Sequence, residues 1–412
     1  MTNPCNIRTW RRILGALALS CVLAPWGAGS AAADAVSDAD PRMAFFLDVD
    51  GIGDPGPGAP VDLSKLGYKS PPVILHRPSG VFRILFIGGS SVYSITTPQY
   101  SFPAAFARHL QRQFPDKTLE VVNLGVPGAG FIEHMAVYRF WRHRIDHDAV
   151  VYAVHPGSDW QDHKHSHALS LFGPGVTERT DILVSPNGVN AAIRAAATKR
   201  NPAPAAPTPP ASAAPPIDER YEAQNQYTDA AYVKILSNWS LPYRPGTIGA
   251  LCTGHEWAKR FITFIAEAEQ ASPPSVVLLL PTHAGVSAQW RARLLAELRA
   301  SGDDLDPHIP AAVLLRFAER AGMQTPVFDI TDALRRQAEN GTDLYYGTNA
   351  HWSVAGNAIA GEVAAALAAR HLVPAAAEPQ GENAAPTIPR ESLETWQPVA
   401  DAIWDGTNPR CG

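Results

Sequence analysis

Short apolar runs alternate with stretches of helical spacing through most of this chain. Each run is about five or six residues long, closed by glycine, proline or polar residues, which is typical of a buried strand. Between the runs, apolar residues recur with helical spacing, as in Phe102, Phe106, Leu110 and Phe114. The predicted strands cover residues 83–88, 120–124, 149–154, 275–280 and 326–330, and the predicted helices cover 102–114, 132–145, 288–299, 311–321 and 354–371.

This alternation predicts an α/β fold. Strands separated by helices pair in parallel, and helices then cover both faces of the sheet. We therefore expect a three-layer α/β/α sandwich with a mainly parallel, flavodoxin-like sheet. The chain has 412 residues, of which 46% are hydrophobic, so it can bury a sizeable core. Its net charge of −5 excludes the basic footprint that nucleic-acid binding requires, and we expect no nucleic-acid partner.

The beginning of the chain has the pattern of an export signal. Three arginines within the first twelve residues precede an apolar run over residues 13–24, and a stretch of small residues ends in three alanines at 31–33. The run is shorter than the roughly 20 residues that span a bilayer, which disfavours the alternative of an uncleaved membrane anchor. We expect a mature chain without a transmembrane segment, located in the periplasm or secreted.

Composition divides the rest of the chain into parts. Residues 166–236 break the strand–helix alternation, and within them residues 201–216 contain seven prolines. We interpret this insertion as a tether without a packed core, and the alternative is a flap over the site. The predicted organisation is a signal peptide at 1–33, an N-terminal arm at 34–80, an α/β domain at 81–375 that carries the insertion, and a C-terminal tail at 376–412.

The cysteines give one long-range prediction. Cys5 and Cys21 lie in the predicted signal peptide, so an exported mature chain keeps Cys252 and Cys411. Two cysteines in an oxidising compartment are expected to pair, which would attach the C-terminal tail to the domain. Two free thiols are the alternative.

Candidate site residues follow the predicted strands. Gly88-Gly89-Ser90 comes directly after the first strand, Gly128 lies in a glycine-rich loop after the second, and residues 155–159 (His-Pro-Gly-Ser-Asp) follow the third. Asn349-Ala-His351 precedes the last helix. Loops at the carboxyl ends of parallel strands form the ligand crevice of open α/β sheets, so these residues are expected to meet. A serine at a helix start is otherwise usually a cap.

In their order, these positions resemble the motifs of the SGNH (GDSL-like) hydrolase superfamily, as an exported bacterial member. The resemblance implies that Ser90 is the nucleophile and His351 the base, with an oxyanion held by the backbone N–H groups of Ser90 and Gly128. Two positions depart from the family pattern. Ser158 replaces the family's oxyanion asparagine, and no aspartate lies two or three residues before His351.

Asn349 stands where the family has its aspartate. Its amide oxygen would fix the tautomer of His351, as asparagine does in Cys-His-Asn sites, but it supplies no negative charge. The site is therefore slowed, rescued by another carboxylate such as Asp343, or inactive. Ser158 would contribute a third oxyanion donor through its hydroxyl.

The function expected from this resemblance is an exported serine esterase that hydrolyses O-acyl esters through an acyl-enzyme on Ser90, with an O-acetyl ester on a glycan as the leading substrate. The alternatives are an O-acyltransferase that modifies an exported polysaccharide, and a non-catalytic glycan-binding module. No cofactor is expected, the expected partner is a small-molecule or glycan acyl ester, and the sequence does not identify protein partners. An assay of acyl release against acyl transfer separates the two enzymes.

Aromatic side chains near the candidate site residues are candidate substrate contacts. His155, Trp160 and Trp352 are predicted to bind substrate, although tryptophan is more often a core residue. His163, His165 and His167 would share one face of an extended chain and could then bind zinc, but a solvated polar loop is favoured and no metal is expected.

Overall fold

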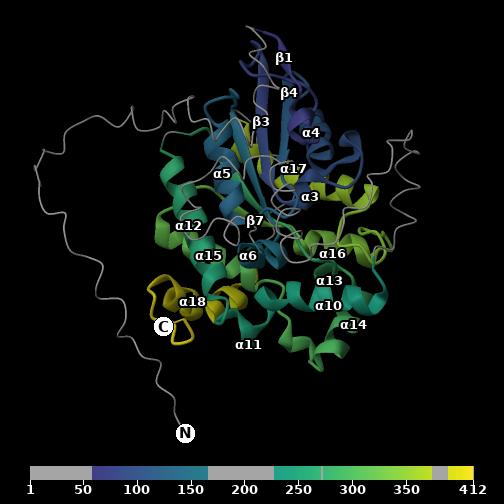
Figure 1. Cartoon of the computed structure of the whole chain (residues 1–412), viewed down its shortest axis with the longest axis vertical. Coiled ribbons are helices and arrows are strands. Elements are labelled where there is room, and N and C mark those ends of the chain that lie inside the picture. The colour runs from purple at the N-terminus through teal and green to yellow at the C-terminus, as the bar shows by residue number, and fades with distance from the viewer. Residues whose placement is uncertain (1–57, 166–226, 271, 374–387, 412) are drawn as a thin grey trace, which may run out of the picture. The chain divides into compact units, whose positions relative to one another are not determined.

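The computed structural model describes residues 58–165, 227–270, 272–373 and 388–411, and of residues 161–165 the backbone alone (Figure 1). All of them belong to one compact unit, Arg42–Gly412. The predicted signal peptide and the proline-rich stretch at 201–216 lie outside the described residues, so both stay predictions.

A five-stranded parallel sheet forms the centre of this unit. Its strands are β3 (Val81–Gly88), β4 (Thr118–Gly125), β5 (Ala149–Val154), β6 (Ser275–Leu279) and β7 (Val327–Asp329). They pair in the order β4-β3-β5-β6-β7, and every pair is parallel. The second strand along the chain thus lies outside the first, followed by the third, fourth and fifth, which is the flavodoxin-like order. The predicted α/β fold class is confirmed.

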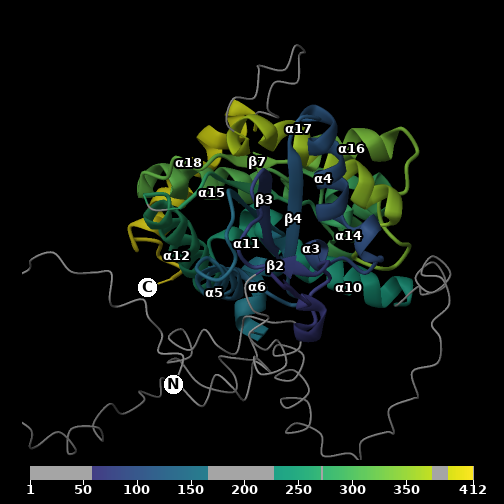
Figure 2. The ribbon, with the colours of Figure 1, turned by 90° about the horizontal axis from the view of Figure 1, so that it is seen from above.

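Helices cover both faces of the sheet (Figure 2). Successive side chains of a strand point to opposite faces, and β3 accordingly places Leu85 and Ile87 in one apolar cluster and Ile84 and Phe86 in the other. The first cluster is closed by α5 (Phe131–Trp141), α12 (Cys252–Ala268), α15 (Ile309–Ala321) and α18 (Arg390–Trp404), and the second by α4 (Phe102–Gln113), α16 (Thr331–Glu339) and α17 (Val354–Leu372).

Close approach fixes the last predicted helix in place. A Cβ atom at Gly361 of α17 would lie 2.5 Å from the Cβ atom of Ala105 on α4, so glycine is required where these two helices cross. On α4, the predicted stripe of Phe102, Phe106 and Leu110 is fully buried, with an exposed fraction of 0% for each side chain. Apolar periodicity therefore predicted this layer correctly.

The segments outside the alternation are more structured than the sequence indicated. Residues 60–74 form a short hairpin, β1 (Pro60–Val61) with β2 (Val73–Ile74), and between its strands Leu63 and Leu66 are buried in the main core. At the other end of the chain, α18 packs on α15, where Arg316 forms an ion pair with Asp401. The N-terminal arm and the C-terminal tail thus join the domain where they are described.

The insertion also ends earlier than predicted. Helix α10 (Asp229–Trp239) begins inside the range 166–236 and buries Tyr232, Val233 and Leu236 in a third apolar cluster. The remaining short helices are α3 (Ser90–Tyr93), α6 (Pro156–His165), α11 (Pro245–Ile248), α13 (His283–Val286) and α14 (Ala288–Leu298), with 3₁₀ turns at Leu63–Leu66, Pro98–Tyr100, Leu241–Tyr243 and Gly302–Asp304.

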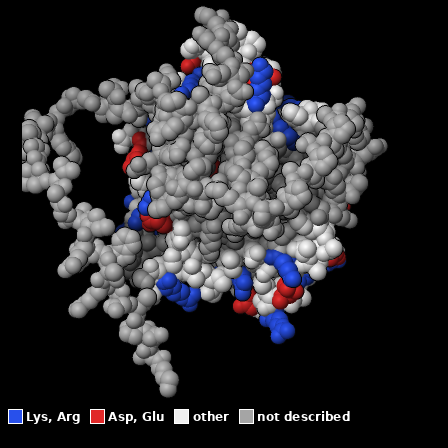
Figure 3. Space-filling model, in the orientation of Figure 1, with Lys and Arg blue, Asp and Glu red and all other residues white. Residues whose placement is uncertain are grey.

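The structure also bears on the predicted disulfide, on membrane-spanning helices and on the surface charge. Cys252 and Cys411 form a disulfide, as expected, which links the start of α12 to the C-terminal tail. None of the helices in the described ranges has both the length and the apolar character needed to cross a membrane. Where side chains of described residues are visible in Figure 3, cationic and anionic groups are intermixed rather than gathered in a basic stripe.

Candidate active site

The candidate residues meet at the carboxyl edge of the sheet. Ser90 follows β3, Gly128 follows β4, and His155 follows β5, and these three strands are adjacent and parallel. His351, in the loop before α17, lies close enough to His155 for the two rings to interact electrostatically. The topology therefore brings together loops that are almost 200 residues apart in sequence.

Two glycines position Ser90. A Cβ atom at Gly88 would lie 2.7 Å from the carbonyl oxygen of Ala153 on β5, and one at Gly89 would lie 3.1 Å from the carbonyl oxygen of Ala129. The first distance is too short for any side chain, so glycine is required at position 88, whereas a side chain at position 89 would fit only if its neighbour shifted by a few tenths of an ångström. Ser90 is the first residue of α3 and is partly exposed.

Two backbone N–H groups near Ser90 have no partner within the described part of the chain. Neither the N–H of Ser90 nor that of Gly128 donates a hydrogen bond to another described residue. The N–H of Val126 donates to the carbonyl oxygen of Gly88 at 2.9 Å, which keeps the Gly128 loop beside the end of β3. Free N–H groups beside a nucleophile are what an oxyanion hole consists of.

Asn349 holds His351 through its side-chain oxygen. The Oδ1 atom of Asn349 lies 2.7 Å from Nδ1 of His351 and also accepts the backbone N–H of His351 at 3.1 Å. An amide oxygen only accepts, so Nδ1 carries the proton and Nε2 presents a lone pair. Burial and the positive charge of Lys69 lower the pKa of His351 to about 4, so the ring is neutral at pH 7.

No carboxylate contacts the imidazole of His351 among the described residues. Asp343, the suggested substitute, is exposed and contacts this loop through its backbone carbonyl oxygen, which accepts the hydroxyl of Ser353 at 2.7 Å. The suggestion that Asp343 supplies the missing charge is therefore wrong. The Oγ atom of Ser90 makes no hydrogen bond to His351 in this structure, and their pairing as nucleophile and base stays a prediction.

Residues 155–159 form a closed hydrogen-bond network. The hydroxyl of Ser158 lies 3.0 Å from Oδ1 of Asp159 and 3.1 Å from Nδ1 of His155. A hydroxyl has one proton, so Ser158 can serve an oxyanion only by giving up a partner inside this network. The structure therefore does not support the predicted third oxyanion donor.

His155 is a member of the same network rather than an open substrate contact. It is 7% exposed, and its Nδ1 accepts the backbone N–H of Ser158 at 3.2 Å. Burial, with a smaller contribution from His351, lowers the pKa of His155 to about 4. Nδ1 is thus occupied by the protein itself.

The two tryptophans are core residues, which corrects their predicted role in substrate binding. Trp160 is 0% exposed and its Nε1–H donates to His255 at 3.2 Å. Trp352 is 4% exposed and packs edge-on against Phe102 at 5.2 Å between ring centroids. Indole rings bury more apolar area than almost any side chain, so both stabilise the layers beneath the site.

Sequence reasoning missed Lys69. Its Nζ donates to the carbonyl oxygens of Ser94 and Thr96 at 2.6 and 2.9 Å, and it lies 4.7 Å from the ring centroid of Tyr93. These contacts tie the segment before β3 to the end of α3, beside His351. Burial lowers the pKa of Lys69 to about 8. No sequence motif includes Lys69, because it reaches the site only through contacts that form when the chain folds.

The described residues contain no cluster of three or more metal-ligating side chains. Helix α6 continues through His165, and residues two apart on a helix do not share a face, so the extended-chain geometry proposed for His163 and His165 is absent. His167 lies outside the described residues.

Comparisons with known proteins add little to this picture. No protein-family model and no curated protein matches the chain. One similar solved structure is LAE5, an alpha/beta hydrolase enzyme from the metagenome of Lake Arreo, Spain, with 14% sequence identity and a TM-score of 0.32 over 72% of this chain and 97% of that chain. A likeness at this TM-score carries no argument, so the fold and the site rest on the residues of this chain.

Proposed function

We propose that this protein is a serine acyl hydrolase that acts on O-acyl esters. The observation that carries the proposal is the hydrogen bond between Nδ1 of His351 and Oδ1 of Asn349 at 2.7 Å, because it leaves Nε2 as a base at the sheet edge where Ser90 begins α3. A serine hydroxyl needs such a base to become a nucleophile at neutral pH.

The reaction proceeds through an acyl-enzyme. Nε2 of His351 takes the hydroxyl proton as Oγ of Ser90 attacks the ester carbonyl carbon, and the N–H groups of Ser90 and Gly128 hold the oxyanion that forms. Collapse breaks the ester C–O bond, and the departing alcohol takes the proton from His351. Water then attacks the acyl-serine with the same assistance, which releases the carboxylic acid and restores Ser90.

We propose an exported protein whose substrate is an O-acetyl ester on a glycan. The apolar run at 13–24 after three arginines supports export to the periplasm or the medium. Transfer of the acyl group to a sugar hydroxyl differs from hydrolysis only in the acceptor of the second step. Release of acetate, measured against transfer of acetyl to an oligosaccharide, separates the two reactions.

A second candidate is a non-catalytic glycan-binding module. It is favoured by the absence of a carboxylate beside His351 among the residues that the structure describes, and by the low pKa of that histidine, since both disfavour the imidazolium of the transition state. Under this alternative, Ser90 and His351 are only structural.

Labelling with a fluorophosphonate probe, together with turnover of p-nitrophenyl acetate, tests the proposal. We expect the parent protein to be labelled and to release nitrophenol, and Ser90→Ala and His351→Ala to do neither. Ser91→Ala, which removes the neighbouring hydroxyl, is the matched control and should behave as the parent. A parent protein that is neither labelled nor active would favour the binding module.

A further inference from the structure

A depression opens beside the loop that carries His351. It consists of two cavities of about 230 and 300 Å³, which share His283, Ser287, Gln289, Asp343 and Tyr345 and are therefore parts of one pocket. Its volume falls within the range of small-molecule sites. One wall comes from α13 and the start of α14, and the other from the segment after α16.

The floor of this pocket is aromatic. The ring of His283 is stacked on that of Tyr345, with 4.4 Å between centroids and 13° between planes, and Trp290 lies 5.6 Å from His283. The hydroxyl of Tyr232 lies 2.9 Å from Nδ1 of His283, which holds the imidazole in place. Burial lowers the pKa of His283 to about 3, so the floor is uncharged at neutral pH.

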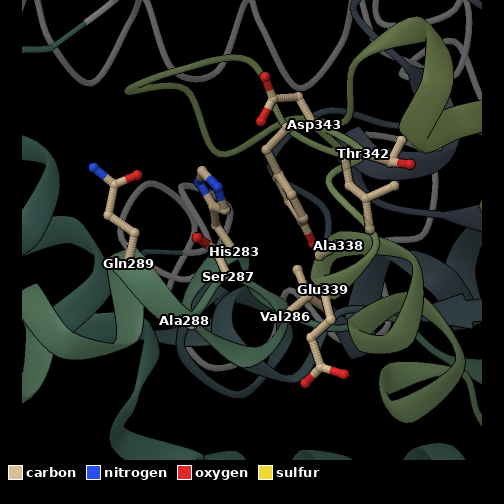
Figure 4. Close-up of a pocket in the computed structure, with 11 residues that line it drawn as sticks. His283, Val286, Ser287, Ala288, Gln289, Ala338, Glu339, Thr342 and Asp343 are labelled. Atoms are coloured by element: carbon tan, nitrogen blue, oxygen red, sulfur yellow. The ribbon is translucent and has the colours of Figure 1, made fainter.

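The rim of the pocket is polar and acidic. Asp343 and Gln289 are exposed, and Figure 4 shows their side chains on two sides of the His283 ring. Glu339 and Asp229 add two more carboxylates, whereas Arg293, the one cationic side chain that described residues contribute to the lining, forms an ion pair with Asp229. An anionic ligand would therefore meet excess negative charge.

The pocket borders the loop that carries Asn349 and His351. Thr348 lines the second cavity and directly precedes Asn349, the partner of His351. The carbonyl oxygen of Pro281, in the loop after β6, accepts the hydroxyl of Tyr345 at 2.6 Å. A ligand in the pocket would thus contact the same loops that hold the catalytic groups.

We propose that this pocket is a subsite for a neutral sugar ring of the substrate. An aromatic floor surrounded by carboxylate, amide and hydroxyl groups suits a ring with apolar faces and hydroxyls at its edge, and the acidic rim excludes uronates and phosphates. This inference rests on the proposed function, because it names the part of the ester substrate that the site holds.

Binding to the catalytically silent Ser90→Ala protein tests the subsite without requiring catalysis. The probes are tetrasaccharides of glucose, mannose, N-acetylglucosamine and galacturonate, measured by saturation-transfer NMR and calorimetry. We expect at least one neutral tetrasaccharide to bind, and galacturonate not to bind. Asp343→Ala and Gln289→Ala in the same background should each weaken that binding by about tenfold, since a hydrogen bond to a charged or polar group is lost.

Matched substitutions control for general effects. Glu297→Ala removes an exposed carboxylate of α14 outside the pocket, and Gln337→Ala removes an exposed amide of α16, and both should leave binding unchanged. Failure of all neutral probes to bind, preferential binding of galacturonate, or equal losses in the controls would overturn the subsite. Nitrophenyl acetate turnover by the parent protein reports separately on the proposed function.

Discussion

Two neighbouring histidines at the edge of the sheet are held in opposite ways. His155 is buried and His351 is partly buried, and both have a pKa lowered to about 4. Nδ1 of His351 donates to Asn349, which leaves Nε2 unprotonated, whereas Nδ1 of His155 accepts from Ser158, which leaves its proton on the other nitrogen. The partner of Nδ1, rather than the pKa, therefore distinguishes the proposed base from its neighbour.

The largest expected effect is the difference in labelling rate between substitutions of the two histidines. His351→Ala should lower the rate of fluorophosphonate labelling about 10,000-fold, because the serine loses its base. His155→Gln keeps an acceptor for the N–H of Ser158, so we expect a loss of less than about tenfold. Labelling rates of purified proteins, with circular dichroism to check folding, measure both. Comparable losses in the two variants would mean that the difference in hydrogen bonding does not determine their roles.

A carboxylate at position 349 should strengthen the base. Asn349→Asp keeps the acceptor oxygen and adds a negative charge beside Nδ1, which stabilises the imidazolium, so kcat/KM should rise roughly 10- to 100-fold. The same charge raises the pKa of His351, so the acid limb of the pH profile moves upward from about pH 4. Asn340→Asp, at an exposed position, is the control. An unchanged rate and an unchanged limb would show that His351 is not the base.

The low pKa values predict acid sensitivity of the fold. A histidine has a pKa near 6.5 in the unfolded chain, and His155 and His351 keep values of about 4 when folded. Between these values the unfolded chain binds more protons, so stability is full above about pH 6.5 and falls as the pH drops towards 4. We expect a decrease in Tm of roughly 5 to 10 °C by calorimetry, and a smaller decrease in His155→Gln. A Tm that is flat from pH 6.5 to 4 would contradict the burial of neutral rings.

The smallest effect concerns Lys69. Lys69→Met removes the positive charge that lowers the pKa of His351, so the acid limb of kcat/KM should move up by less than one pH unit. Lys69→Arg keeps the charge and should leave the limb in place. Identical shifts in both variants would attribute the change to the lost contacts with Ser94 and Thr96 instead.

The sheet and its main helices were predictable because each buries a regular apolar face. Helix α10 and the hairpin at 60–74 were missed, because each is short. Their few buried residues do not recur over a stretch long enough to show a period. For the site, the spacing of Asn349 and His351 correctly predicted their hydrogen bond. The closed network around Ser158, the burial of Trp160 and the approach of Lys69 were not predictable, because each depends on contacts between segments distant in the chain.

Mass spectrometry of the fluorophosphonate adduct tests the central claim most directly. Digestion with trypsin releases residues 84–108 as one peptide, and fragmentation locates the adduct among its serines. The account predicts an adduct on Ser90 in the parent protein and its absence in His351→Ala. An adduct on another residue, or one on Ser90 that persists without His351, would contradict it.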